Sequence, residues 1–210
     1  MAAHVLDTES VPGTPAAGQA IVYVDNVSKR LSMKDDAGNV RSLSLTNFST
    51  SAQAPTAATL TYLTGSALAI PSGKMQIGSM FRWKFNMTKT AAGVAASTID
   101  IRIGTNGTTA DTARLTFTKP AGTAVVDEAW CEVVMTVRGP LSASGIVVGT
   151  FNMTHNLQIT GHAIIPCVVA TVVSSAFDVT IASLIVGLTI TTGAADAITI
   201  QHVQSEVINV

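Results

Sequence analysis

Short segments in which apolar and polar residues alternate recur through the second half of the chain and much of the first. In MFRWKFNM, Phe81, Trp83 and Phe85 share one side, and in TIDIRI the isoleucines of residues 98–103 do the same. A period of two is typical of strands with one buried face, because successive side chains of a strand point in opposite directions. We find no convincing 3.6-residue period of an amphipathic helix. The sequence therefore predicts an all-β protein.

Turn residues separate these segments, and TNGT at 105–108 contains an Asn-Gly pair, which is a strong hairpin signal. Further strands are expected at 113–118, 129–138, 145–153, 157–166, 167–173, 177–191 and 196–210. Roughly eight to ten short strands with regular turns indicate a sandwich or a barrel. Eight strands in two sheets is the jelly-roll count. We therefore predict a jelly-roll β-sandwich over residues 61–210.

The first 60 residues are organised differently. Residues 1–19 include VPGT and further Pro and Gly, which indicates an extended arm. Residues 20–43 contain the short strands AIVYV, LSM and VRSL, which form a β-hairpin module too small for a core of its own. Residues 44–60 are rich in Ser, Thr and Ala and are expected to be a linker. The hairpin module therefore needs partners.

The residues expected to take part in assembly or attachment are apolar residues and prolines of the arm and the hairpin module. They are Val11, Pro12, Pro15, Ile21, Val22, Tyr23, Val24, Leu31, Met33, Val40 and Leu43. The same module carries seven of the chain's 25 Lys, Arg, Asp and Glu residues, with alternating sign and at turn positions. That pattern fits solvated hairpin loops around a shared core.

The surface of this protein is poor in charge. Only 12% of the residues are charged, about half the typical share, and the net charge is −1. Such a surface is hard to keep soluble as a monomer, so we expect much of it to be buried against other subunits. The near-neutral balance argues against a nucleic-acid partner, which needs a basic stripe.

No membrane span or secretion signal is expected. The most apolar run, at 179–192, is shorter than the roughly 18 residues that span a bilayer, and it suits a buried strand. The N-terminus lacks the basic and apolar regions of a signal peptide. The sequence thus predicts a soluble protein made in a cytoplasm.

No constellation of residues predicts catalysis, a cofactor or a metal. His155 and His162 are seven residues apart, on opposite faces of the strand expected there, and are interpreted as surface or loop residues. Asp127 and Glu128 are adjacent and point opposite ways, which does not suit paired acid–base work. Asp111 is expected to cap the Asn-Gly turn or to form an ion pair with Arg114. The sequence therefore predicts no enzyme.

Two further interpretations concern thiols and aromatic residues. Cys131 and Cys167 are expected to be buried reduced thiols, although a disulfide between them stays open. Trp83 and Trp130 are both expected in the core. Glycan binding through exposed aromatic residues stays open as well, because sandwich proteins of this kind often bind sugars.

The segment TPAAGQAIVYVDNVSKRLSMKDDAGNVRSL at 14–43 resembles a motif of tailed-bacteriophage virion proteins, in which a Pro-Gly stretch and an apolar strand precede gxLxxKdxxGxvxxL. Residues 62–118, with TVRG at 136–139 and ITIQHVQSEV at 198–207, are similar to the trimeric jelly-roll domains attached to such modules. The resemblance implies a non-enzymatic virion component. In such proteins the N-terminal hairpins interlock around a three-fold axis and the jelly rolls pack side by side.

The resemblance leaves two functions open. The leading one is a capsid cement or decoration protein, a homotrimer that stabilises the head by contacting the major capsid protein or another virion protein. An arm of 19 residues can extend roughly 60 Å, enough to cross a neighbouring subunit and pair with it. The alternative is a short tail or head fibre that binds host-surface glycan through the jelly roll. Either protein is made in the bacterial cytoplasm and ends in the virion.

Overall fold

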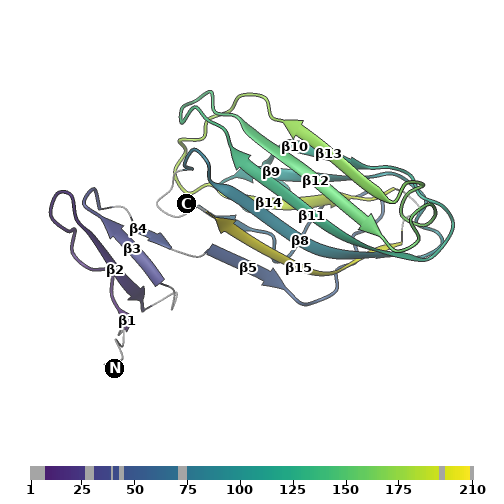
Figure 1. Cartoon of the computed structure of the whole chain (residues 1–210), viewed down its shortest axis with the longest axis horizontal. Helices are drawn as coiled ribbons and strands as arrows, with labels where there is room; N and C mark the ends of the chain where they lie inside the picture. The colour runs from purple at the N-terminus through teal and green to yellow at the C-terminus, as the bar shows by residue number, and fades with distance from the viewer. Residues whose placement is uncertain are drawn as a thin grey trace.

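A computed structural model describes residues 8–26, 31–38, 40–42, 45–70, 75–193 and 197–208. Within these ranges the protein is all-β and contains no helix, as the sequence predicted. The strands form three sheets, and Figure 1 shows a small N-terminal sheet beside a larger two-layered body.

The N-terminal sheet has the strand order β1-β2-β3-β4. Its strands are β1 (Thr8–Glu9), β2 (Ala20–Asp25), β3 (Leu31–Asp35) and β4 (Val40–Ser42). The pairing of β1 with β2 is parallel, whereas β2, β3 and β4 form an antiparallel meander. This meander corresponds to the hairpin module expected at 20–43.

The two-layered body is a β-sandwich in which every strand pairing is antiparallel. The larger layer has the order β13-β12-β11-β8-β15-β5 and consists of β5 (Leu45–Ser49), β8 (Met80–Lys89), β11 (Asp127–Val137), β12 (Val147–His155), β13 (Cys167–Val173) and β15 (Ile198–Ile208). The smaller layer has the order β10-β9-β14-β6, with β7 also on β14, and consists of β6 (Thr61–Tyr62), β7 (Leu68–Ala69), β9 (Ser97–Gly104), β10 (Thr112–Lys119) and β14 (Ile185–Thr191).

The hydrophobic core lies between these two layers. Phe81, Trp83 and Phe85 of β8 and the isoleucines of β9 are all buried in it, which confirms both alternating patterns. The indole Nε1 of Trp83 donates a hydrogen bond to the Ser66 carbonyl oxygen at 2.8 Å. The one polar atom of this large side chain is therefore satisfied inside the core.

The last strand keeps its apolar residues inward by means of a bulge. Ile198, Ile200 and Val203 are all buried, although Ile200 and Val203 are three residues apart. The pairing of β15 with β8 shifts register between Ile200 and His202, so that Gln201 is an extra residue. A bulge of this kind resets the alternation, and Val203 returns to the core side.

Two predicted strands differ in the structure. Residues 157–166 form a loop instead of a strand, because Gly161 adopts φ +84° and the loop bonds to other segments of the chain. The segment predicted at 177–191 becomes a strand only at Ile185. Before that point, Asp178 accepts bonds from the N–H and hydroxyl of Thr180, and Ser183 has φ 61°, which breaks the extended conformation.

The predicted linker at 44–60 also differs, because its first part is the edge strand β5. This strand pairs with β15, and the Ser205 hydroxyl donates to the Asn47 carbonyl oxygen at 3.0 Å. The Asn47 amide in turn donates to the Ala67 carbonyl oxygen at 2.8 Å. The residues of β5 thus belong to the sandwich because of hydrogen bonds to segments distant in sequence. Local composition does not encode such bonds.

Candidate assembly and ligand-binding surfaces

One face of the N-terminal sheet carries a patch of partly exposed apolar side chains, with Asp35 on the same side at one end. The register of β2 and β3 places Val22 opposite Met33 and Val24 opposite Leu31, so these four side chains share a side. Val22 is 49% exposed and Leu31 is 39% exposed, whereas Val24 and Met33 are half-buried. We call these four residues the open face. It unites four residues that the sequence singled out for assembly.

The opposite side of this sheet carries Ile21, Tyr23 and Val40. Tyr23 is buried, and burial, followed by the nearby Asp25 carboxylate, raises the pKa of its hydroxyl. Lys34 also lies on this side, and its Nζ donates to the Pro12 carbonyl oxygen at 2.8 Å. The arm therefore lies against this side of its own sheet.

The remaining predicted assembly residues are spread along the arm or fall elsewhere. Val11 is exposed, and Pro12 and Pro15 are half-buried. Gly18 anchors the end of the arm by donating its N–H to the Asp36 carboxylate at 2.6 Å. Leu43 lies outside the described residues.

The outer face of the six-stranded sheet, the side turned away from the core, presents Trp130. Its side chain is 40% exposed, so the prediction that it belongs to the core was wrong. Cys131 and Val133, its neighbours in β11, point inward, which directs Trp130 outward beside Asn86 of β8. Glu128 and Glu132 flank Trp130 on the outward side, and these two acidic residues were the local signal of its orientation.

A groove of about 290 Å³ lies on the outer face near the β5 edge. Its lining residues come from β5, β8 and β15 and are Thr46, Asn47, Phe48, Arg82, Lys84, Gln204, Ser205 and Glu206. Arg82 Nε donates to Glu206 Oε1 at 2.6 Å, and Arg82 Nη2 contacts the same oxygen. Phe48 is 69% exposed at this groove. The groove therefore combines a bare aromatic ring with fixed polar groups.

A second depression, of about 250 Å³, lies beside the loop after β9. Asp111 accepts hydrogen bonds there from the backbone N–H groups of Asn106 and Gly107, so it caps the Asn-Gly turn as predicted. The Arg114 guanidinium lies 4.4 Å from the centroid of the Phe177 ring. Burial lowers the pKa of this guanidinium. The polar and charged groups of this depression are thus engaged in holding the loop after β9. The groove near β5 is therefore the stronger candidate for a ligand site.

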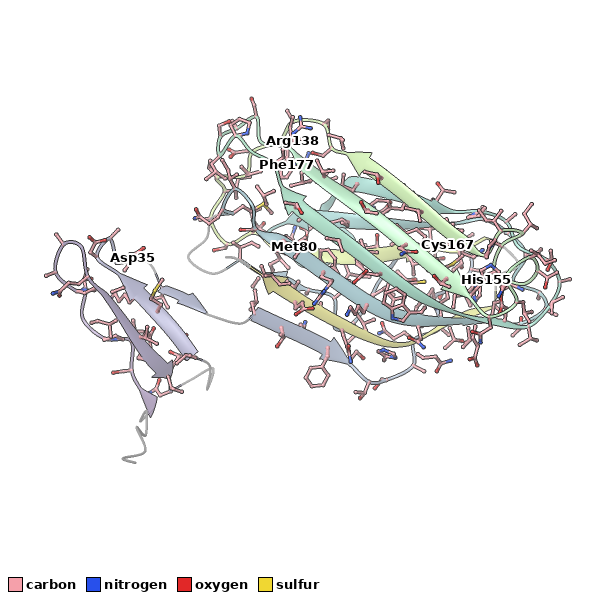
Figure 2. The ribbon with its side chains drawn as sticks, viewed as in Figure 1. Asp35, Met80, Arg138, His155, Cys167 and Phe177 are labelled. Carbon is pink, nitrogen blue, oxygen red and sulfur yellow. The ribbon has the colours of Figure 1, made fainter. Side chains whose placement is uncertain are left out.

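Buried polar groups gather at the end of the sandwich far from the N-terminal sheet, where Figure 2 labels His155. His155 Nδ1 lies 2.7 Å from the Asp127 carboxylate, and its Nε2 lies 2.7 Å from the Ile165 carbonyl oxygen. The backbone N–H of His162 donates to the same carboxylate at 2.9 Å. Both histidines were expected to be surface or loop residues; both are buried, which contradicts a surface position, but His162 does lie in a loop, whereas His155 ends β12. Their bonds anchor the loop between β12 and β13.

Charge inside this group is balanced by hydrogen bonds. Burial alone would raise the pKa of Asp127, but the bonds from His162, His155 and Glu128 lower it below its usual value. Burial and the Lys119 ammonium lower the pKa of His162 to about 4. His162 is therefore neutral at pH 7. Lys89 Nζ donates to three backbone carbonyl oxygens, and Lys119 Nζ donates to two.

The side chains of this buried group are covered by protein and bond largely to backbone carbonyl oxygens of adjacent loops. Among the described residues, no group of three or more His, Cys, Asp or Glu is placed to hold a metal ion. What the arrangement does chemically is fix the loops at 120–126 and 156–166.

Those two loops form an apolar end of the sandwich. Neither contains Asp, Glu, Lys or Arg, and they are joined by a bond from Thr123 N to Gly161 O at 2.9 Å. Their exposed large apolar residues are Val125, Val126, Leu157, Ile159, Ile164 and Ile165. Lys89, Lys119 and Asp127 at this end are buried, so the two loops themselves present no charged side chain.

The two thiols are both free. Cys131 is buried as predicted, but Cys167 is exposed, so its predicted burial was wrong. The Cys167 thiol donates to Asn152 Oδ1 at 3.1 Å on the outer face. Cys131 and Cys167 therefore lie on opposite sides of one sheet.

Comparisons with known proteins give only weak likenesses. No family model matches the chain, and no curated protein matches it. Among solved structures, it is similar to a protein of unknown function from Shewanella oneidensis, with 10% identity, a TM-score of 0.33, and coverage of 78% of this chain and 86% of that one.

Two other solved structures show comparable likeness. An alginate lyase, Aly36B, in complex with alginate trisaccharide has 11% identity and a TM-score of 0.31 over 92% of this chain and 88% of that one. A legume lectin-like domain from Entamoeba histolytica has 8% identity and a TM-score of 0.24 over 76% and 89%. Scores of this size carry no argument about function.

The described part of the chain has no helix suited to crossing a bilayer.

Proposed function

We propose that this chain is a structural protein of a bacteriophage virion, in which three copies of a jelly-roll sandwich assemble through their N-terminal sheets. Its leading role is that of a capsid cement or decoration protein that binds the major capsid protein or another virion protein. The observation that carries this proposal is the open face of the N-terminal sheet.

The open face needs a partner for a physical reason. A small sheet is marginal in water unless at least one face packs against other apolar groups. Here one side is occupied by the chain's own arm, while Val22 and Leu31 remain largely exposed on the other. Three copies related by a three-fold axis bury these side chains against one another and cover exposed strand edges.

The arm and the sandwich supply the remaining surfaces. Val11 is exposed on the arm, which suits contact with a neighbouring protein. The apolar end formed by 120–126 and 156–166 is a second uncharged surface that gains from burial in an assembly. A head-stabilising protein needs such multiple weak contacts, because many copies act together. We therefore propose the virion as its location.

The alternative is a short tail or head fibre that binds host-surface glycan through the sandwich. Trp130 favours this alternative, because its ring is exposed on the outer face and not buried in the core, where it was expected. An exposed aromatic ring can contact a glycan. Both functions are non-enzymatic.

Capsid binding by a truncated protein tests the cement role. Deletion of residues 1–19 is expected to abolish binding to purified heads and to lower their resistance to heat. The control is the full chain carrying Ile181→Ala, because Ile181 is 44% exposed and lies outside the arm, the open face and the apolar end. Normal occupancy of heads by the truncated protein would contradict the cement role, and a copy number far below that of the major capsid protein would favour the fibre.

A further inference from the structure

The outer face of the six-stranded sheet has the features of a sugar-binding surface. We propose that it binds a neutral oligosaccharide across β5, β15, β8 and β11, between the exposed rings of Phe48 and Trp130. This deepens the fibre alternative by naming the site and the ligand class. It concerns a single sandwich, so it does not depend on trimer formation or on location in a virion.

The strand register sets the distance between the two rings. Phe48 is opposite Gln204, Gln204 is opposite Lys84, and Lys84 is opposite Glu132. Trp130 lies two residues from Glu132 on the same side of β11. Three strand spacings and one two-residue step place the backbones of the two aromatic residues roughly 16 Å apart. That span takes a chain of a few sugar rings, with an aromatic residue beneath each end.

The side chains between the rings offer both donors and acceptors. Gln204 and Asn86 carry amides, and the cross-strand register brings His202 beside Asn86. Arg82 is fixed against Glu206 by its two contacts at the groove. Sugar hydroxyls donate and accept at once, so mixed amide, guanidinium and carboxylate groups match their chemistry. A binding site of this type orients its ligand through a few fixed polar groups.

The charges of this region favour an uncharged ligand. Arg82 and Lys84 supply two positive groups, and Glu128, Glu132 and Glu206 supply three negative groups on the same outer face. The sum is −1, so this face carries no excess of positive charge. A polyanion such as nucleic acid or an acidic polysaccharide requires an excess of basic groups, which this face does not offer.

The two aromatic residues are held on strands rather than on loops. Binding sites built on rigid elements lose little conformational entropy when a ligand docks. Both rings are substantially exposed, with 69% for Phe48 and 40% for Trp130, so they are open to a ligand without rearrangement of the core. An aromatic ring contributes most when it packs flat against an apolar ring face, and each hexose presents such a face of C–H groups.

The test uses the full-length protein and three neutral probes, maltohexaose, cellohexaose and chitohexaose, in titration calorimetry. Saturable binding of at least one probe is expected. Phe48→Ala and Trp130→Ala are each expected to weaken the Kd about fivefold or more, as for the loss of one aromatic contact. The matched control is Ile159→Ala, because Ile159 is also 69% exposed but lies at the far apolar end. Its Kd is expected to be unchanged.

Several outcomes would overturn the proposal. The first is that no probe binds, and the second is that neither aromatic variant weakens binding. The third is that light scattering shows a lower particle mass for Phe48→Ala and Trp130→Ala, since the outer face would then be an interface between copies of this chain. Thermal unfolding of both variants is measured alongside to confirm that they fold. If the protein is a trimer but binds no probe, the sugar-binding inference fails and the cement role stands. If the protein is a monomer but binds a probe, the proposed assembly fails and the sugar-binding inference stands.

Discussion

The Asp127 carboxylate lies 2.7 Å from Nδ1 of His155, and both side chains are completely buried. The other ring nitrogen of His155 lies 2.7 Å from the Ile165 carbonyl oxygen. Both ring nitrogens of His155 are therefore within hydrogen-bond distance of an oxygen atom. The pair thus joins the start of β11, the end of β12 and the loop that follows.

Asp127→Asn is expected to lower the free energy of unfolding by about 3 kcal/mol, because the buried carboxylate bonds to His155 and to the N–H of His162 and its loss disturbs both contacts. Urea denaturation monitored by circular dichroism measures this change. Glu128→Gln is the control, since the neighbouring Glu128 is exposed and its loss is expected to cost less than about 0.5 kcal/mol. Equal effects of the two substitutions would show that the buried pair contributes nothing.

Stability is expected to fall in mild acid because of His162. Its pKa in the folded protein is about 4, below the ordinary value of 6.5. The unfolded chain therefore takes up this proton as the pH falls through 6.5, while the folded chain resists until about 4. The stability present above pH 6.5 is lost progressively over that window, by up to about 3 kcal/mol.

Unfolding free energies measured between pH 7 and pH 4 test this expectation. His162→Gln is expected to remove most of the slope over the window, because glutamine does not titrate. His202→Gln, at a half-exposed histidine of the outer face, serves as the control and should retain the slope. If the His162 variant keeps the full pH dependence, burial of this ring is not its cause.

The strands that could be read from the sequence are those with strong contrast between their two faces. In β8, bulky aromatic residues alternate with Arg82 and Lys84, so the buried side is unambiguous. In β11, Glu128 and Glu132 mark the outer side, but Trp130 and Val134 lie on that side as well, so the contrast between the two faces is weaker than in β8. Periodicity therefore identified the strand but not the position of Trp130.

Long-range contacts decide the features that the sequence did not reveal. The loop at 156–166 has the composition of a strand, but Asp127 and Thr123, distant in sequence, bond to it at Gly161 and His162. For the candidate assembly surface, the pattern of β3 already placed Leu31 and Met33 on one side. Which side the arm covers depends on the bond from Lys34 to Pro12, and no local pattern encodes that choice.

The two thiols are expected to differ in reactivity. Cys167 is exposed, whereas Cys131 is buried and burial raises the pKa of its thiol. Because the thiolate is the reactive form, iodoacetamide at neutral pH is expected to modify Cys167 alone. Intact-mass spectrometry should show one adduct on the folded protein and two in denaturant. Cys167→Ser should abolish the native adduct, and two adducts on the folded wild type would contradict the burial of Cys131.

The open face is expected to control the oligomeric state. Val22→Lys places a charge among the apolar side chains that assembly would bury, so it is expected to disrupt the trimer. The sandwich itself should be unaffected, because Val22 lies in the N-terminal sheet. Ile181→Lys introduces the same charge at a comparably exposed aliphatic residue (44%) that lies outside the proposed assembly surfaces, and it should leave the trimer intact. Far-ultraviolet circular dichroism of both variants checks that they fold.

Multi-angle light scattering of the full-length protein tests the central claim most directly. The chain has a mass of 21.6 kDa, and the proposed assembly predicts a particle of three times that mass. It also predicts that Val22→Lys lowers the mass to that of one chain. A wild-type protein that stays at 21.6 kDa over the accessible concentration range would contradict the proposed assembly.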